Sequence, residues 1–135
     1  MGNLTSIVYP DNTAVNYAYD ANNNNNLVSV TDWANRVTSY TYDVNNMLVG
    51  VTKPDGSVTA TAYDNAGCIT STVEKTASGT VITGFEYTYD NLSRIAEEKH
   101  LANSTRICYT YGNLNIIKPF KFMSMMLLNH LKSII

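Results

Sequence analysis

Bulky side chains alternate with small or polar ones in several short stretches of this chain. In the first stretch, Val15, Tyr17 and Tyr19 are separated by Asn16 and Ala18. The same alternation recurs at residues 38–42, 59–63, 85–89 and 107–111. A period of two is typical of a β-strand that turns its large side chains to one face. Each stretch is therefore predicted to be a strand with one bulky face.

Each alternating stretch ends on a tyrosine, and an aspartate follows it in four of the five copies. The four pairs are Tyr19-Asp20, Tyr42-Asp43, Tyr63-Asp64 and Tyr89-Asp90, and the fifth copy reads Tyr111-Gly112. The steps between these tyrosines are 23, 21, 26 and 22 residues. A period of about 20–25 residues indicates one small structural unit that has been copied. The residues that every copy shares are needed for packing one repeat on the next, so an active site is a weaker expectation.

After each tyrosine a short turn leads to an aliphatic residue that starts a second strand. These aliphatic residues are Leu27, Leu48, Ile69 and Ile95. A second turn, such as Pro54-Asp55-Gly56, then returns the chain, because proline presets φ and glycine takes the left-handed conformation. One hairpin cannot bury its face alone, so the copies should stack. We predict an all-β fold in which tandem antiparallel β-hairpins of residues 1–114 form a curved or spiralling sheet.

The Tyr-Asp pair suits the end of a strand. The tyrosine ring can stack on its neighbours while its hydroxyl seeks a polar partner at the sheet margin. The aspartate begins the turn, where its carboxylate can accept backbone N–H groups. A left-handed residue is expected four positions after the tyrosine. Asn46 and Gly67 fit that conformation well, whereas Ser93 should cost about 1 kcal/mol.

Composition and charge narrow the possible partners. The apolar fraction of 44% is that of a globular protein. Residues 1–112 carry six basic and eleven acidic side chains, a net charge of −5, and the basic ones are scattered. We therefore predict no nucleic-acid binding. The chain opens without a signal peptide and has no run of about 18 apolar residues, so no membrane span is expected.

Residues 115–135 form a divergent tail, predicted to be helical or irregular. The tail carries three lysines and no acid. Its apolar residues recur at helical spacing, at Phe120, Met123, Leu127, Leu131 and Ile134. Three interpretations stay open. The tail is a basic amphipathic helix for a membrane or partner, a helix that covers an open sheet edge, or unrelated coding sequence after a truncation or frameshift.

No set of side chains converges on a catalytic or metal site. The turn that starts at Asp20 resembles a calcium loop only superficially, because Thr31 stands where a glutamate is required. His100 and His130 are isolated, and Cys68 and Cys108 are interpreted as free thiols. We predict a protein that is not an enzyme and has neither a metal nor a cofactor. Trp33 lies in a hairpin turn, where it could stack on a sugar or a protein, or fold over its own hairpin.

The units resemble the RHS, or YD, repeat family. The family pattern is roughly Tyr-Asp-x-x-Gly-Arg-Leu, then a strand, a turn and the next Tyr-x-Tyr-Asp. This chain reads Tyr63-Asp64-Asn65-Ala66-Gly67-Cys68-Ile69 and Tyr89-Asp90-Asn91-Leu92-Ser93-Arg94-Ile95. Asn or Ser replaces the glycine in several units, residues 22–26 are all asparagine, and only four full units occur. We therefore expect a fragment of a family member.

The resemblance implies a hairpin array that forms part of a shell in a large secreted or cell-surface protein, such as a wall-associated or toxin-delivery protein. The repeats would be a non-catalytic scaffold or ligand-binding surface. Their partners would be further repeats of a parent protein, a second copy of the chain, or a carbohydrate or protein ligand. The alternative is a carbohydrate-binding module that uses Trp33 and rim tyrosines. A third hypothesis is a toxin enzyme fragment with its chemistry in residues 113–135.

Overall fold

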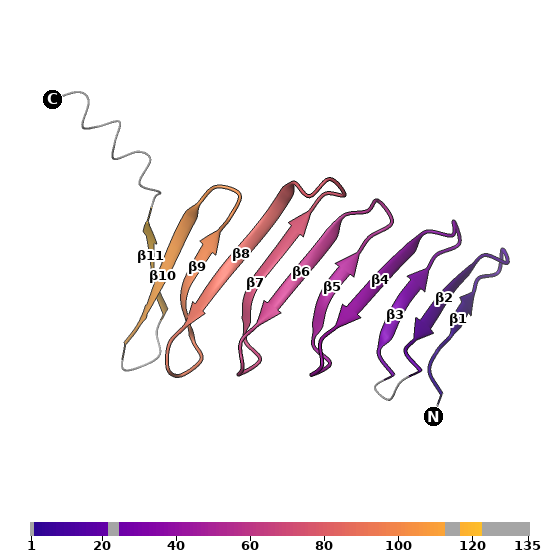
Figure 1. Ribbon diagram of the computed structural model, residues 1–135, viewed down its shortest axis with the longest axis horizontal. Coiled ribbons are helices and arrows are strands. Elements are labelled where there is room, and N and C mark those ends of the chain that lie inside the picture. The colour runs from indigo at the N-terminus through magenta and orange to yellow at the C-terminus, as the bar shows by residue number, and fades with distance from the viewer. Residues whose placement is uncertain (1, 22–24, 113–116, 123–135) are drawn as a thin grey trace, which may run out of the picture. The chain divides into compact units, whose positions relative to one another are not determined.

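The computed structural model describes residues 2–21, 25–112 and 117–122 of the 135-residue chain. Within these residues every regular element is a strand, and the eleven strands form one sheet in chain order (Figure 1). They are β1 (Ser6–Val8), β2 (Ala14–Tyr19), β3 (Leu27–Thr31), β4 (Val37–Tyr42), β5 (Leu48–Thr52), β6 (Val58–Tyr63), β7 (Ile69–Lys75), β8 (Val81–Tyr89), β9 (Ile95–His100), β10 (Thr105–Tyr111) and β11 (Ile117–Phe122). The predicted all-β fold of antiparallel hairpins is confirmed. The described part of the chain holds no helix of the length and hydrophobicity that a bilayer span requires.

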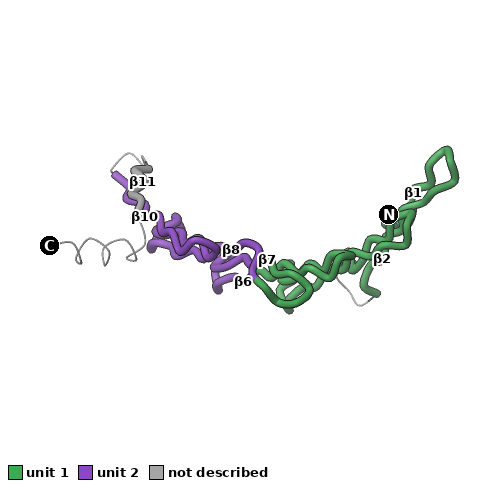
Figure 2. Tube along the Cα trace, turned by 90° about the horizontal axis from the view of Figure 1, so that it is seen from above, with its two compact units in different colours: residues 1–61, 74–80 green, residues 62–73, 81–135 purple. Residues whose placement is uncertain are grey.

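The chain divides into two compact units, drawn in green and purple in Figure 2. The first unit comprises residues 1–61 and 74–80, and the second comprises residues 62–73 and 81–135. Each unit is described by itself below. The curvature that the sequence suggests for the whole sheet stays a prediction, as does the domain boundary at residues 114 and 115.

In the first unit the register places the large side chains of successive strands opposite one another. Tyr17 of β2 pairs with Val30 of β3, and Val30 pairs in turn with Thr38 of β4. One hairpin further on, Tyr40 pairs with Val51. Residues directly opposite on neighbouring strands share a face, so the copied alternation becomes a continuous row. Aromatic and β-branched residues fill such a pleated surface well.

The second unit continues the pattern through β8, β9 and β10. Phe85 pairs with His100 and Tyr87 pairs with Glu98 between β8 and β9. Ile107 of β10 lies opposite Glu98 on its other side. This row therefore holds an ionisable residue between two bulky neighbours.

Strand β11 corrects part of the prediction for the tail. Residues 117–122 pair antiparallel with β10, from Tyr111 opposite Ile117 to Arg106 opposite Phe122. The prediction of a helix was wrong for these six residues. A short apolar run fits a helix or a strand, and β10 offers backbone hydrogen-bond partners for a strand. Residues 123–135, and with them most of the predicted helix, lie outside the described residues.

Seven connecting turns share one five-residue backbone. In the turn 43–47, the amide of Asp43 donates to the carbonyl of Met47 (2.9 Å) and the amide of Asn46 donates to the carbonyl of Asp43 (3.1 Å). Asn46 has a φ of 64°. The other turns of this kind are 9–13, 32–36, 53–57, 64–68, 76–80 and 90–94. The predicted left-handed residue is confirmed at Asn46, Gly67 and Ser93. The register of the two strands shifts by a bulge next to the turn, as between Thr41 and Tyr42.

Side-chain oxygens close these turns in two ways. In the first, an aspartate at the first position accepts two backbone amides. Oδ1 of Asp43, for example, accepts the amides of Asn45 and Met47, both at 2.9 Å. Asp32, Asp64 and Asp90 do the same in their own turns.

In the second way, the acceptor occupies the third position and a hydroxyl residue the fifth. Oδ1 of Asp55 accepts both the amide (2.9 Å) and the hydroxyl (2.7 Å) of Ser57. Asp11 pairs in this way with Thr13. Both arrangements satisfy turn amides that the strand ladder leaves without a partner.

The tyrosines of three Tyr-Asp pairs, and Tyr111 of the altered fifth copy, connect their repeats to the previous ones. Strands β3 and β4 are connected along the chain only by the turn 32–36, which lies at the opposite end of the strands from the Tyr-Asp turns. The strand ends at which the Tyr-Asp turns lie are called the Tyr-Asp edge. There the hydroxyl of Tyr42 donates to the carbonyl of Leu27, the first residue of β3, at 3.0 Å. The same bond joins Tyr19 to Leu4 (3.1 Å), Tyr89 to Ile69 (2.6 Å) and Tyr111 to Ile95 (2.7 Å). These four bonds connect neighbouring repeats at the end of the strands where no turn joins them.

This bond can be tested by removing one hydroxyl. We expect Tyr89→Phe to lower the free energy of unfolding by about 0.5–1.5 kcal/mol, because a neutral hydrogen bond contributes that much. Chemical denaturation of the whole chain measures the change. Tyr9→Phe is the matched control, because this ring is 44% exposed and its hydroxyl has no partner among the described residues. Equal effects of the two substitutions would contradict the fastening role.

The turn aspartates also predict how stability depends on pH. The pKa of Asp55 lies below its ordinary value of 3.8, because the Ser57 hydroxyl, and then its amide, hydrogen-bond the carboxylate. The pKa is lower in the folded chain than in the unfolded chain. The stabilisation that ionised Asp55 gives the folded chain is therefore complete above about pH 4. It is lost as the pH falls through the pKa that Asp55 has in the folded chain.

Asn103 already makes the equivalent bonds with Thr105, as a neutral acceptor. We therefore expect Asp55→Asn to unfold at nearly the wild-type denaturant concentration at neutral pH and to lose less stability on acidification. Asp55→Ala, which removes the acceptor, should be destabilised at neutral pH as well. Denaturation midpoints measured from about pH 7 down to pH 2 compare the three. An Asn variant as acid-sensitive as wild type would refute this origin of the pH dependence.

Candidate interaction surface

The two faces of the sheet differ in the size of their side chains. The bulky face carries the rows of Tyr17, Tyr40 and their aliphatic partners. In the first unit the other face carries mostly small or hydroxyl residues, with Ser29 opposite Ser39 and Gly50 opposite Thr41. A Cβ atom at residue 50 would meet the Thr41 hydroxyl, which would have to rotate away. In the second unit this other face carries charged residues, such as Glu86 opposite Lys99.

The bulky face remains largely open. Among the described residues Val15, at 9% exposure, is the only buried apolar residue, and none of their side chains is fully buried. Each unit is a single layer of strands, and no second layer of described residues covers it. The aromatic residues are therefore half-exposed, although sheets of globular domains usually bury such a face against another layer. The bulky face is the candidate interaction surface of this chain.

The predicted repeat residues lie along one edge of the sheet, each within its own turn. Tyr19, Tyr42 and Tyr89 make the hydroxyl bonds described above, and Asp43, Asp64 and Asp90 close their turns, with Gly67 as the left-handed residue of its turn. Asp20 spans a longer turn, in which its amide donates to the carbonyl of Asn26 (2.9 Å). Tyr63 also has a partner. Among the described residues no cluster of His, Cys, Asp and Glu could hold a metal ion.

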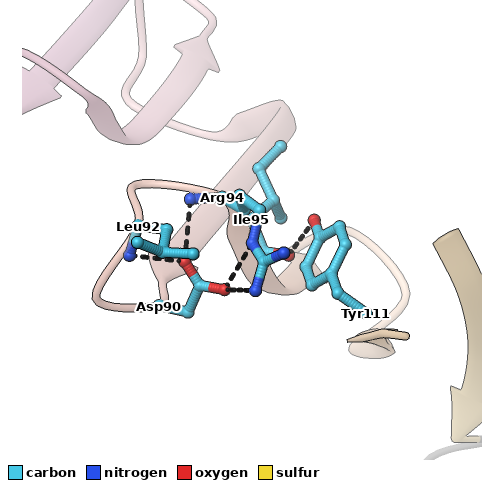
Figure 3. A network of polar contacts seen from close by, with 5 residues as sticks. All are labelled: Asp90, Leu92, Arg94, Ile95 and Tyr111. Carbon is cyan, nitrogen blue, oxygen red and sulfur yellow. Dashed lines mark hydrogen bonds and ion pairs between the residues drawn. The ribbon is translucent and has the colours of Figure 1, made fainter. Parts of the chain in front are cut away.

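Arg94 connects two repeats in a compact network, shown in Figure 3. Its Nε donates to Oδ2 of Asp90 at 2.8 Å, and its Nη2 lies 2.7 Å from the same oxygen. The guanidinium carbon is 4.1 Å from the centre of the Tyr111 ring, a cation–π contact. The Arg94 hydrogen bond holds the pKa of Asp90 below its ordinary value. The tyrosine that lacks its own aspartate is thus held by the preceding repeat.

Asparagines make the corresponding connection in the first unit. The amide of Asn26, which occupies the position of Arg94, donates to Oδ1 of Asn46 in the next repeat at 3.2 Å. Asn3 and Asn25 exchange a reciprocal pair of amide hydrogen bonds. The asparagines that replace the family's glycine and arginine therefore join repeats by amide pairs. Residues 22–24 of the asparagine run lie outside the described residues.

Glu98 is the unusual member of the bulky face. It is the third residue after the aliphatic Ile95, and the equivalent residues of the first unit are Val30 and Val51. The hydroxyl of Tyr109 donates to Oε2 of Glu98 at 3.2 Å. Sequence analysis missed this residue. Comparing repeat positions would have found it, since a carboxylate replaces valine there.

Aromatic residues lie beside Glu98 in the register, with Tyr87 opposite it on β8. Phe85 stacks on the His100 ring at 4.8 Å between ring centres and on Tyr87 at 6.3 Å. Nε2 of His100 lies 3.5 Å from the Thr83 hydroxyl. Burial, and then the Glu98 charge, raise the pKa of Tyr87 and of Tyr109 above the ordinary value of 10.0. The histidine that was expected to be an isolated surface residue therefore belongs to an aromatic cluster.

Trp33 projects from the turn between β3 and β4. Its side chain is 60% exposed, and the guanidinium carbon of Arg36 lies 6.0 Å from the ring centre. Arg36 is itself bound to Asp32 through a contact of 2.7 Å. The indole therefore has a cation from its own turn on one side and solvent on much of the rest.

The influence of Glu98 on its neighbours can be measured directly. We expect Glu98→Gln to lower the pKa of Tyr87 and Tyr109, because the negative charge that disfavours the phenolate is removed. Tyr109 should change more, since it also hydrogen-bonds the carboxylate. Titration of ¹³Cζ-labelled tyrosine by NMR resolves the individual rings. Glu97→Gln, one residue away on the opposite face, is the control, and equal shifts in both variants would contradict the assignment.

Comparison with known proteins agrees with these repeats. The family described as RHS Repeat matches residues 22–58 and, overlapping them, residues 42–80. No curated protein sequence matches the chain.

One solved structure supports the same fold, and a second was also matched. The Tc holotoxin pore of Photorhabdus luminescens aligns over 81% of this chain with a TM-score of 0.54 and 15% identity. A crystal structure of a TcdB2–TccC3 complex with Cdc42 aligns over 78% with a TM-score of 0.43 and 14% identity. This chain spans 7% of the length of either of those chains. Residues 22–80 of this chain therefore match the RHS repeat family, and their Tyr-Asp units correspond to its repeats.

Proposed function

We propose that this chain is a non-catalytic wall segment of a large secreted or cell-surface protein of the toxin-delivery type. Its role is to extend a shell of RHS repeats, with one face turned to whatever the shell encloses or displays. The observation that carries the proposal is the open bulky face, on which Val15 alone among the described apolar residues is buried. A sheet of this kind needs a second surface to cover it.

Two further observations support a structural role. The interactions at the Tyr-Asp edge connect one repeat to the next, as the Arg94–Tyr111 contact does. Among the described residues these side chains contact neighbouring repeats, and no cluster of His, Cys, Asp and Glu could hold a metal ion. The similarity in fold to a chain of the Tc holotoxin pore, which is far longer than this one, supports a place within a larger assembly.

The proposal predicts how the isolated chain behaves. With an open face and strand edges available for pairing, the 135-residue chain should self-associate. Sedimentation velocity at several concentrations should show species larger than a monomer that increase with concentration. A clean monomer that melts cooperatively would count against a wall segment that depends on neighbours. The result bears on the whole sheet and does not depend on Trp33.

Trp33 favours a second candidate function, the binding of carbohydrate. An indole exposed by 60% on a turn can stack on a sugar ring. We expect a glycan array to show hits that Trp33→Ala weakens at least about tenfold if a stacking contact worth about 1.4 kcal/mol is lost. Val44→Ala, an exposed position in the turn 43–47, is the control. An array without hits, or hits that Trp33→Ala leaves unchanged, would reject this function.

A further inference from the structure

Glu98 stands apart from the other acidic residues of the described chain. The aspartates close turns, as Asp43 and Asp55 do. The remaining glutamates each have a cation: Glu86 pairs with Lys99 (2.7 Å), Glu97 with Arg106 (3.2 Å) and Glu74 with Lys53. Among the described residues Glu98 has neither a turn amide nor a cation, and its one polar contact is the Tyr109 hydroxyl.

The surroundings of Glu98 make that difference significant. Glu98 is half-buried, and it lies opposite Tyr87 on β8 and Ile107 on β10. A carboxylate accepts about four hydrogen bonds, and Tyr109 supplies one at Oε2. A charge in an apolar row is costly unless it is paired. The remaining acceptor positions therefore favour a charged donor from outside the described chain.

The same chain shows what such a site looks like when it is complete. At the Tyr-Asp edge, Asp90 binds the guanidinium of Arg94, which lies against the Tyr111 ring. Glu98 and Tyr109 provide the same two components, a carboxylate and a phenol ring, without the arginine. A guanidinium suits this combination because its planar fork binds a carboxylate and stacks on aromatic rings.

We propose that Glu98, with Tyr87 and Tyr109, is a docking site for an arginine side chain carried by another polypeptide segment that lies on the bulky face of the second unit. A polypeptide is the ligand, because the carboxylate stands in an open row of apolar side chains. Phe85 and Ile107 on either side offer apolar surface to the residues that flank the arginine. The inference goes beyond the wall role, since it defines the chemistry of what this face contacts.

The test is a titration of the whole chain with short synthetic peptides, followed by ¹³Cζ-tyrosine NMR. One peptide is Leu-Leu-Arg-Leu-Leu with blocked ends, and its matched control carries neutral citrulline in place of arginine. We expect the arginine peptide to shift the Tyr87 and Tyr109 signals and to bind at least about tenfold more tightly than the citrulline peptide. Glu98→Gln should remove this preference, and Glu97→Gln should keep it.

Two further arms separate the alternatives. Glu98→Arg should reverse the preference towards a peptide with glutamate at the centre, which a variant that merely unfolds could not do. Free arginine amide should bind more weakly than the peptide. Equal binding of the two would overturn the polypeptide assignment. Equal affinity for the arginine and citrulline peptides in the wild-type chain would overturn the site itself, as expected if a cation elsewhere in the chain already pairs with Glu98. Both peptides are compared on the same protein sample, so self-association affects them alike, and sedimentation tests the wall role separately.

Discussion

The hydrogen bond from the tyrosine at the end of a strand to a main-chain carbonyl of the preceding repeat, seen at Tyr19, Tyr42, Tyr89 and Tyr111, is the interaction on which the sheet depends. A single layer of strands has almost no buried core among the described residues, so local contacts must hold it together. Turns join the strands of one hairpin, but they leave neighbouring hairpins unconnected at the Tyr-Asp edge. The tyrosine closes that gap at Tyr19, Tyr42, Tyr89 and Tyr111. Because the bond uses a main-chain carbonyl, it is independent of the side chain in the preceding repeat.

That independence explains why the repeats tolerate variation elsewhere. The residue before each aliphatic position changes from Asn26 to Arg94. Asn26 contacts the next repeat through an amide hydrogen bond, and Arg94 does so through a cation–π contact. The left-handed turn residue changes from asparagine to glycine to serine. The backbone of the turn stays the same, because the aspartate at its start accepts the amides that the ladder leaves over.

The same construction leaves the bulky face free for function. Contacts at the edges stabilise the sheet, so the residues on its face are not all needed for a core. Glu98 can therefore replace a valine in the row, at a position where a carboxylate would be expelled from a closed core. The Asp90–Arg94–Tyr111 network and the Glu98–Tyr109 pair use the same chemistry in two places. One of them connects repeats, and the other faces outward.

Much of this architecture follows from the sequence alone, because a period of two and a turn residue with positive φ are local properties. The strands, the turns and the left-handed conformations at Asn46, Gly67 and Ser93 could be predicted in this way. The identity of residues 117–122 could not, since a short apolar run becomes a strand only when β10 offers its backbone. Nor could the surroundings of Glu98 be predicted. Its neighbours come from β8 and β10, and only the register of the folded sheet decides which side chains of distant segments share a face.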